Sequence, residues 1–422
     1  MVKKLVFPAV TVLAGFLILM MIWMAAGARL QVQGAQKAAD RTPIVLADRA
    51  PIRRIYDPYP TFEGIALDEN RGEVFVGNDN RGSTRSVLVY RAEFQPTDKV
   101  MEPLRRIAGP KTHLGAICGV AVDPDNKELY VVNPDGGDNM TVFPFESNGN
   151  VGPARELNVA HGAWGIFIDQ KHDELFVTSE HVNKVSVYRR TADGDEDPVR
   201  YIQGPNTEMA DPHGIVVDSE RNEVFVTNHG NWHKTVPGEG YQLFGEGKLA
   251  HARGSQSHAG VPEPLGPSTG KFMPPSITVY SRTAQGDVKP LRVIQGSQTQ
   301  LEVPLGLFPD SATHQIAVAN AGNDAILFFD INASGNVGPV RVLKGPATEL
   351  KSPTGIFIDN KRNELWVTNW DGHTVTIFPR NAQGNAAPLR VLRSGPASAP
   401  ATGFGGGAFA YDPKRDEILA AN

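Results

Sequence analysis

The chain has 422 residues, a formal net charge of −5 and no block of Lys or Arg beyond its N-terminus, which argues against nucleic acid as a partner. Its single cysteine, Cys118, excludes an intrachain disulfide, a thiolate zinc cluster and a Cys-x-x-Cys-His haem attachment site. Gly and Pro, with 43 and 32 copies, separate many short apolar runs, which is typical of all-β folds rich in turns.

The first element in the chain is an apolar segment that follows Lys3 and Lys4 and extends to about residue 28. It is long enough to span a bilayer, and it also ends in Ala-Gly-Ala, the small-residue pattern of a cleavage site. We therefore expect residues 1–30 to be either a cleaved signal peptide or an uncleaved membrane anchor, followed by a polar tether at residues 31–42. In both cases the positive flank stays in the cytoplasm, so the remaining chain is expected to be exported, in the periplasm or outside the cell.

One short pattern occurs seven times along the rest of the chain: Gly or Ala, three mostly apolar residues, and Asp. Ten residues after each Asp stands Asn or, in one copy, Ser. A fixed spacing of this kind predicts a repeat architecture in which every unit is one supersecondary structure. The seven copies are residues 64–68, 119–123, 165–169, 214–218, 306–310, 355–359 and 408–412.

Each unit carries signals for four strands, which we call a, b, c and d in chain order. Strands a and b are nearly continuous apolar runs, as expected for strands buried on both faces. The repeated Asp after strand a is predicted to cap the a–b turn through its own backbone, and the Asn suits a turn after strand b. Four-stranded antiparallel units with buried inner strands predict an all-β fold, a β-propeller.

The number of repeats predicts seven blades. The seventh unit has only strands a and b before residue 422, and two segments ahead of the first unit, residues 44–47 and 51–55, match strands c and d. We expect these N-terminal strands to complete the last blade and to close the ring without an open sheet edge. The propeller would then occupy residues 43–422.

The loops that differ most between the units are expected at one end of the propeller. Because the strands alternate in direction, the loops that enter strand a and those that leave strand b must share this end, which we call the variable end. The fourth unit carries a long insertion there, residues 229–275, rich in Gly, Pro and His. A long insertion without a strand pattern is usually functional or disordered, and we expect this one to cover the mouth of the central channel.

The strand sequences resemble known repeats. Residues 174–179, 223–228 and 364–369, which read Glu-Leu-Phe-Val-Thr-Ser, Glu-Val-Phe-Val-Thr-Asn and Glu-Leu-Trp-Val-Thr-Asn, resemble the YVTN repeat, and the Gly-Ile-x-Val-Asp strands resemble NHL repeats. The resemblance implies a propeller similar to the lactonase-like and surface-layer proteins. It implies no single function, because such propellers include lyases, lactonases, electron-transfer domains and binding proteins.

A second resemblance concerns a metal site. In gluconolactonase-like and regucalcin-like propellers, which have six blades, a Glu directly before the Gly of the first blade is a ligand of a divalent metal, and Glu63 resembles it. The Asn ligands of those proteins are replaced here by His213 and Thr354. The resemblance implies a metal ligand at Glu63 only; because a carboxylate with histidines can also hold calcium or zinc, the candidate ligands are Glu63, His213 and His229. Cys118, near the same place, is expected to be a buried, inert thiol.

The sequence contains no complete catalytic motif in a proper strand–turn–helix context. The favoured function is therefore a monomeric binding or scaffold module, attached to the membrane only through its N-terminal segment, for a protein or a small molecule on the variable end. The alternative is a metal-assisted hydrolase or lactonase at the channel mouth, in which the ion polarises a carbonyl or activates water. The candidate ligand-binding residues are Glu63, Trp164, His213, His229, Trp232, Thr354 and Trp370.

Overall fold

The computed structural model describes residues 59–79, 84–95, 99–134, 138–232 and 271–396, together with the backbone of two strands, β27 (Phe409–Asp412) and β28 (Glu417–Ala420). The expected membrane segment at residues 1–30, the tether at 31–42 and the strands at 44–47 and 51–55 lie outside the described residues. Residues 233–270 of the insertion also lie outside them. None of the helices in the described ranges is long and apolar enough to cross a bilayer.

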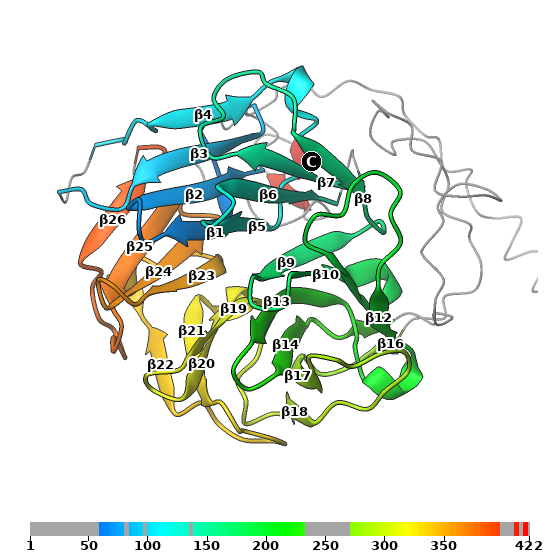
Figure 1. Cartoon of the computed structure of the whole chain (residues 1–422). Coiled ribbons are helices and arrows are strands. Elements are labelled where there is room, and N and C mark those ends of the chain that lie inside the picture. The colour runs from blue at the N-terminus through cyan, green and yellow to red at the C-terminus, as the bar shows by residue number, and fades with distance from the viewer. Residues whose placement is uncertain are drawn as a thin grey trace, which may run out of the picture. The chain divides into compact units, whose positions relative to one another are not determined.

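Six four-stranded antiparallel sheets, blades 1 to 6, follow one another along the described chain (Figure 1). Blades 1 to 3 are β1 (Phe62–Asp68), β2 (Glu73–Asn78), β3 (Ser86–Arg91) and β4 (Arg105–Ala108); β5 (Val120–Asp123), β6 (Glu128–Asn133), β7 (Asn139–Pro144) and β8 (Arg155–Asn158); and β9 (Ala163–Asp169), β10 (Glu174–Ser179), β11 (Lys184–Arg189) and β12 (Arg200–Gln203). Blades 4 to 6 are β13 (Pro212–Asp218), β14 (Glu223–Asn228), β17 (Ser276–Ser281) and β18 (Arg292–Gln295); β19 (Pro304–Asp310), β20 (Gln315–Asn320), β21 (Ala325–Asp330) and β22 (Arg341–Lys344); and β23 (Pro353–Asp359), β24 (Glu364–Asn369), β25 (Thr374–Pro379) and β26 (Arg390–Arg393).

Short elements fill the loops between these strands. Five 3₁₀ helices are described: η1 (Pro110–Thr112), η2 (Glu180–Val182), η3 (Pro205–Thr207), η4 (Ala321–Asn323) and η5 (Pro346–Thr348). At the base of the insertion in blade 4, β15 (Asn231–Trp232) pairs with β16 (Lys271–Phe272). The start of β1 pairs with the end of β2, so the loops that enter the first strand and leave the second strand of a blade share one end, as predicted.

The first strands of the six blades form a closed ring. Each contacts the first strand of the next blade, in the order β1, β5, β9, β13, β19 and β23, and β23 contacts β1 in turn. The four-stranded antiparallel β-propeller is therefore confirmed. The predicted number of seven blades is wrong, and with it the prediction that N-terminal strands close the ring, because blade 6 packs directly against blade 1.

Glycine at the start of each inner strand gives the physical reason for this closure. A Cβ on Gly165 would overlap with the carbonyl oxygen of His213 in the next blade, and a Cβ on Gly355 would lie 2.8 Å from the carbonyl oxygen of Glu63. Blade 6 therefore packs on blade 1 through the same kind of close glycine contact that joins consecutive blades, although its 2.8 Å is the longest of the six.

A threonine in the second strand of a blade also links that blade to the next one, by a hydrogen bond to a backbone carbonyl. Thr178 Oγ1 in blade 3 donates to the carbonyl oxygen of His213 in blade 4 over 2.5 Å. Thr227 makes the corresponding bond between blades 4 and 5. Thr368 Oγ1 in blade 6 donates to the carbonyl oxygen of Glu63 in blade 1 over 2.7 Å, so blades 6 and 1 are joined like any other pair.

Apolar side chains pack between neighbouring blades. The second strands are buried almost throughout, which confirms the interpretation of their continuous apolar runs. Phe176 of β10, with 0% of its surface exposed, packs in one cluster with Ile215 and Val226 of the next blade. The hydrophobic core is therefore a series of layers between sheets, and each blade is stabilised by its neighbours.

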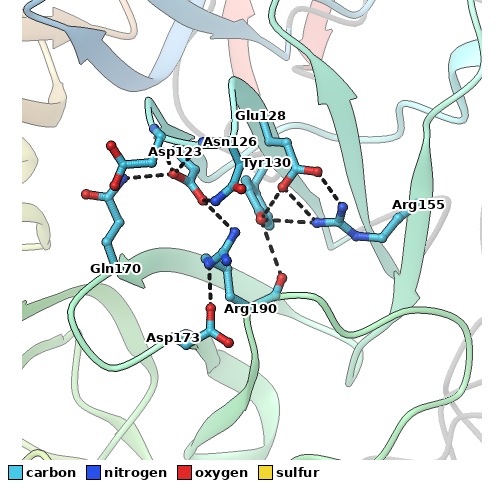
Figure 2. A network of polar contacts seen from close by, with 9 residues as sticks. Asp123, Asn126, Glu128, Tyr130, Arg155, Gln170, Asp173 and Arg190 are labelled. Carbon is cyan, nitrogen blue, oxygen red and sulfur yellow. Dashed lines mark hydrogen bonds and ion pairs between the residues drawn. The ribbon is translucent and has the colours of Figure 1, made fainter.

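The repeated Asp and Asn have structural roles, as predicted. Asp123 Oδ1 accepts hydrogen bonds from the backbone N–H groups of Asp125 and Asn126, which caps the turn between β5 and β6. Figure 2 shows that the same carboxylate also accepts bonds from Gln170 and Arg190 of blade 3, the latter over 2.8 Å. This network links two blades at the end of the propeller opposite to the variable end.

Asn228 shows the role of the second repeated residue. Its Oδ1 accepts a hydrogen bond from the backbone N–H of Ala210, and its Nδ2 donates to Thr278 Oγ1 in the third strand of the blade. The side chain thus ties the loop that enters the blade to the strands within it. Most of the repeated Asp and Asn residues thereby stabilise the fold. A functional site is therefore expected among the residues that differ between blades.

Candidate functional site

The six inner strands enclose a central channel of about 200 Å³. An apolar cavity of about 150 Å³ holds benzene, so this channel has room for a small organic molecule. Its wall consists largely of glycine backbone and apolar side chains, among them Ile65, Val120, Ile166, Ile215, Leu307 and Ile356.

Glu63 is the carboxylate of this channel. It lines the channel at the variable end, and only 2% of its surface is exposed. Within the described part of the chain, neither carboxylate oxygen has a nitrogen or oxygen hydrogen-bonding partner, and the thiol of Cys118 is the group that interacts with it. Burial, followed by the negative charge of Asp79 and then of Glu180, raises the pKa of Glu63 well above its ordinary value, although the Cys118 thiol acts in the opposite direction.

The two other acidic groups have cationic or hydrogen-bonding neighbours. Asp79 Oδ1 lies 3.3 Å from Arg85 Nε. Glu180 lies between two histidines, with Oε1 2.9 Å from His181 Nε2 and Oε2 3.0 Å from His213 Nε2. No cationic side chain faces Glu63 in the ranges that the structure describes.

Two neighbours of His213 favour its cationic form. Its Nε2 donates to Glu180 and its Nδ1 donates to the backbone carbonyl of Asp211 over 3.0 Å, so both ring nitrogens face acceptors. Burial alone would lower the pKa of His213, but the hydrogen bond and charge of Glu180, together with Asp211, raise it above the ordinary value.

The surroundings of His229, in contrast to those of His213, favour the neutral form of its ring. Its ring stacks on that of His213, with centroids 3.5 Å apart and planes inclined by 17°. Burial, and then the charge of His213, lowers the pKa of His229 well below its ordinary value, despite a hydrogen bond to the backbone of Pro304. The surroundings therefore favour the cationic form of His213 and the neutral form of His229.

Asp211, His213 and His229 form a group in which a metal could be bound, with one ligand atom from each within 4.8 Å of the others. The stacked geometry opposes this use. A histidine binds metal through a lone pair in the plane of its ring, and two nearly parallel rings cannot direct these lone pairs at one ion about 2.0–2.1 Å away. Both nitrogens of His213 are also engaged, so metal binding requires the side chains to rearrange.

The structure divides the sequence-predicted residues into groups. Glu63, Trp164 and Thr354 line the channel together. The ring of Trp164 meets that of His213 edge to face at 4.5 Å, which connects the channel wall to the histidine pair. Glu63 is not part of the metal-binding group that contains His213 and His229, so the three residues of the predicted metal site are not gathered around one point.

The two remaining tryptophans lie elsewhere. Trp232 belongs to β15 at the base of the insertion, with Lys271 Nζ 4.9 Å from the centre of its ring. Trp370 directly follows β24, and its backbone N–H donates to the carbonyl of Ser352. Neither is among the described residues that line the channel.

Sequence reasoning did not select Asp79, Glu180 and Asp211 as site residues. Asp79 and Glu180 directly follow the repeated Asn78 and Ser179, so their positions on the variable end were readable from the repeat. The importance of Glu180 depends on His213 of the next blade along the chain, which the spacing does not reveal.

No protein-family model and no curated protein matches the chain. Three similar solved structures are a nidogen/laminin complex (13% identity, TM-score 0.45, 79% of this chain and 93% of that chain), the hydrazine synthase of Kuenenia stuttgartiensis (14%, 0.48, 78% and 99%) and a functionally unknown protein from Desulfotomaculum acetoxidans DSM 771 (14%, 0.47, 83% and 89%). Likenesses this distant carry no argument about function. The assignment to the β-propellers rests on the six sheets themselves.

Proposed function

We propose that this protein is a binding module that takes a small molecule into the variable end of its central channel. The observation that supports it is Glu63, a buried carboxyl group without an N–H or O–H donor among the described residues, in a channel large enough for a ligand. A buried polar group without a partner destabilises the folded state, and a ligand that satisfies it recovers this energy on binding. Trp164 supplies an aromatic surface in the same wall.

The wider setting of the proposal comes from the sequence. We assign the repeats to the YVTN and NHL types, and we propose that the protein is exported as a monomer and attached to the membrane by residues 1–30. Lys3 and Lys4 followed by a long apolar segment support this orientation. Intact-mass measurement of the native protein distinguishes an anchor from a cleaved signal peptide, because cleavage removes the segment.

The binding proposal is tested by NMR with benzyl alcohol as a neutral aromatic probe. We expect the indole N–H of Trp164 and the amide of Thr354 to shift on addition of the probe, because both residues line the channel. The indole N–H of Trp366, a side chain with 0% exposure in the core between blades, serves as the control that should not move. Equal shifts of all three signals, or no shift at all, would contradict binding in the channel.

The second candidate function is the metal-assisted hydrolase, and the cluster of Asp211, His213 and His229 is the observation in its favour. A metal bound there would polarise a carbonyl or activate water. Elemental analysis and thermal unfolding with and without a chelator test it. A stoichiometric metal and a lower unfolding temperature in chelator would favour the hydrolase, whereas their absence would remove it.

A further inference from the structure

We propose that the channel selects a cationic ligand: a small, mainly apolar molecule with one ammonium group, which binds to the carboxylate of Glu63. The inference deepens the proposed function and rests on it, because it names the chemistry of the ligand for the same channel.

The first argument is the balance of charge at the variable end. Of the three acidic side chains Glu63, Asp79 and Glu180, the last two each act electrostatically on Glu63 there. Arg85 faces Asp79, and two histidines face Glu180. Among the described residues Glu63 is thus the acidic group of the three that faces no cationic side chain, and a positive ligand supplies one.

The second argument is what the channel wall lacks. Its described lining contains no Lys, Arg or His. The hydroxyl of Thr354 already donates to the backbone carbonyl of Glu63 over 3.0 Å. An anionic ligand would therefore find no positive partner in the wall and would meet the charge of the acidic groups.

The third argument separates an organic cation from a metal ion. Calcium takes about six to eight oxygen ligands, and zinc takes about four nitrogen, sulfur or oxygen ligands. The described channel wall offers the carboxylate of Glu63, the thiol of Cys118 and a hydroxyl that is already engaged. An ammonium group needs only one carboxylate to balance its charge, and the aromatic ring of Trp164 and the aliphatic wall suit the apolar part of such a ligand.

The test compares benzylammonium with benzyl alcohol, which has nearly the same shape and no charge, by calorimetry on the full-length protein. We expect wild-type protein to bind benzylammonium about 10-fold more tightly, since a hydrogen bond to a charged group typically exceeds a neutral one by roughly this factor. Glu63→Gln should lose this preference while still binding benzyl alcohol. Glu146→Gln, the same change at a side chain that is 71% exposed, should retain it.

A second measurement does not depend on any variant. Burial and the nearby acidic groups raise the pKa of Glu63, and a bound ammonium group favours the ionised carboxylate and so lowers this pKa, which should release protons at any pH between the free and the ligand-bound pKa of the group. Calorimetry in two buffers with different heats of ionisation measures this release directly. The other titratable groups that interact with Glu63 are Asp79, Glu180 and the thiol of Cys118. Each of them affects the pKa of Glu63 and therefore the pH range in which protons are released.

The outcomes separate the two proposals. If benzyl alcohol binds as tightly as benzylammonium, or if Glu63→Gln keeps the preference, the cationic ligand is wrong and binding in the channel stands. If neither compound binds to the wild-type protein, both the inference and the proposed function are wrong. Tighter binding of benzylammonium without proton release at any pH at which the protein is folded would also overturn the role given to Glu63.

Discussion

The junction between blade 6 and blade 1 can be tested by a single methyl group. In Gly355→Ala, the new Cβ would lie 2.7 Å from Thr368 Oγ1, 2.8 Å from the carbonyl oxygen of Glu63 and 3.0 Å from Ile65 Cγ2. The second and third of these atoms belong to blade 1, and one of them is backbone. The substitution can therefore be accommodated only if blade 1 moves away from blade 6.

The magnitude follows from the contacts that this movement disturbs. Overpacking a well-packed interior costs about 1–3 kcal/mol. The movement also weakens the bonds from Thr368 Oγ1 to Glu63 and from the Gly355 N–H to Thr368, each worth about 0.5–1.5 kcal/mol. Ala restricts the unfolded chain more than Gly does, which offsets about 0.4–1 kcal/mol. We expect the free energy of unfolding to fall by about 1–4 kcal/mol.

Urea unfolding of Gly355→Ala and of the control Gly338→Ala provides the assay. A Cβ on Gly338 would come no closer than 3.6 Å to its nearest atom, the carbonyl oxygen of Gln298, so this variant should be neutral or slightly more stable. Equal stability of the two variants would refute direct packing of blade 6 on blade 1. A chain that ends at residue 396 gives a second check, because it retains all 24 strands of the six sheets and should unfold at the same temperature.

Three further predictions concern the blades and the histidine pair. In blade 5 Gln315 stands where the other blades pair Glu with the Arg of the last strand, so Gln315→Glu should pair with Arg341 and stabilise the protein by about 1 kcal/mol in urea unfolding. Phe176→Ala should cost about 3–5 kcal/mol in the same assay, because a fully buried ring is lost; a smaller loss would question the packing between blades. In Glu180→Gln burial should dominate and lower the pKa of His213, which an NMR titration of its ring measures. The raised pKa of His213 stabilises the wild-type fold fully below about pH 6.5 and progressively less as the pH rises through the folded-state pKa, so the variant should lose stability mainly at acidic pH, and a loss independent of pH would contradict the argument.

The candidate site was predictable in part. The repeat placed Glu63, Trp164 and Thr354 at equivalent positions before an inner strand, and equivalent positions of a propeller meet at its axis, so their convergence on the channel followed from spacing alone. The stacking of His213 on His229 did not follow. It depends on the loop geometry after β14 and on the hydrogen bond between His213 and Glu180 of the preceding blade.

The sequence by itself determined the local structure of this protein. Strand pattern, turn capping by Asp123 and anchoring by Asn228 are interactions within about one repeat, and all three were readable from residue type and spacing. The number of blades was decided by tertiary structure alone. Ring closure depends on bonds between residues 291 and 305 positions apart, those of Thr354 and Thr368 to Glu63, and on the close approach of two strands that only glycine allows. Counting repeats predicts how many units exist, but the packing of one inner strand on another sets how many units fit around the axis.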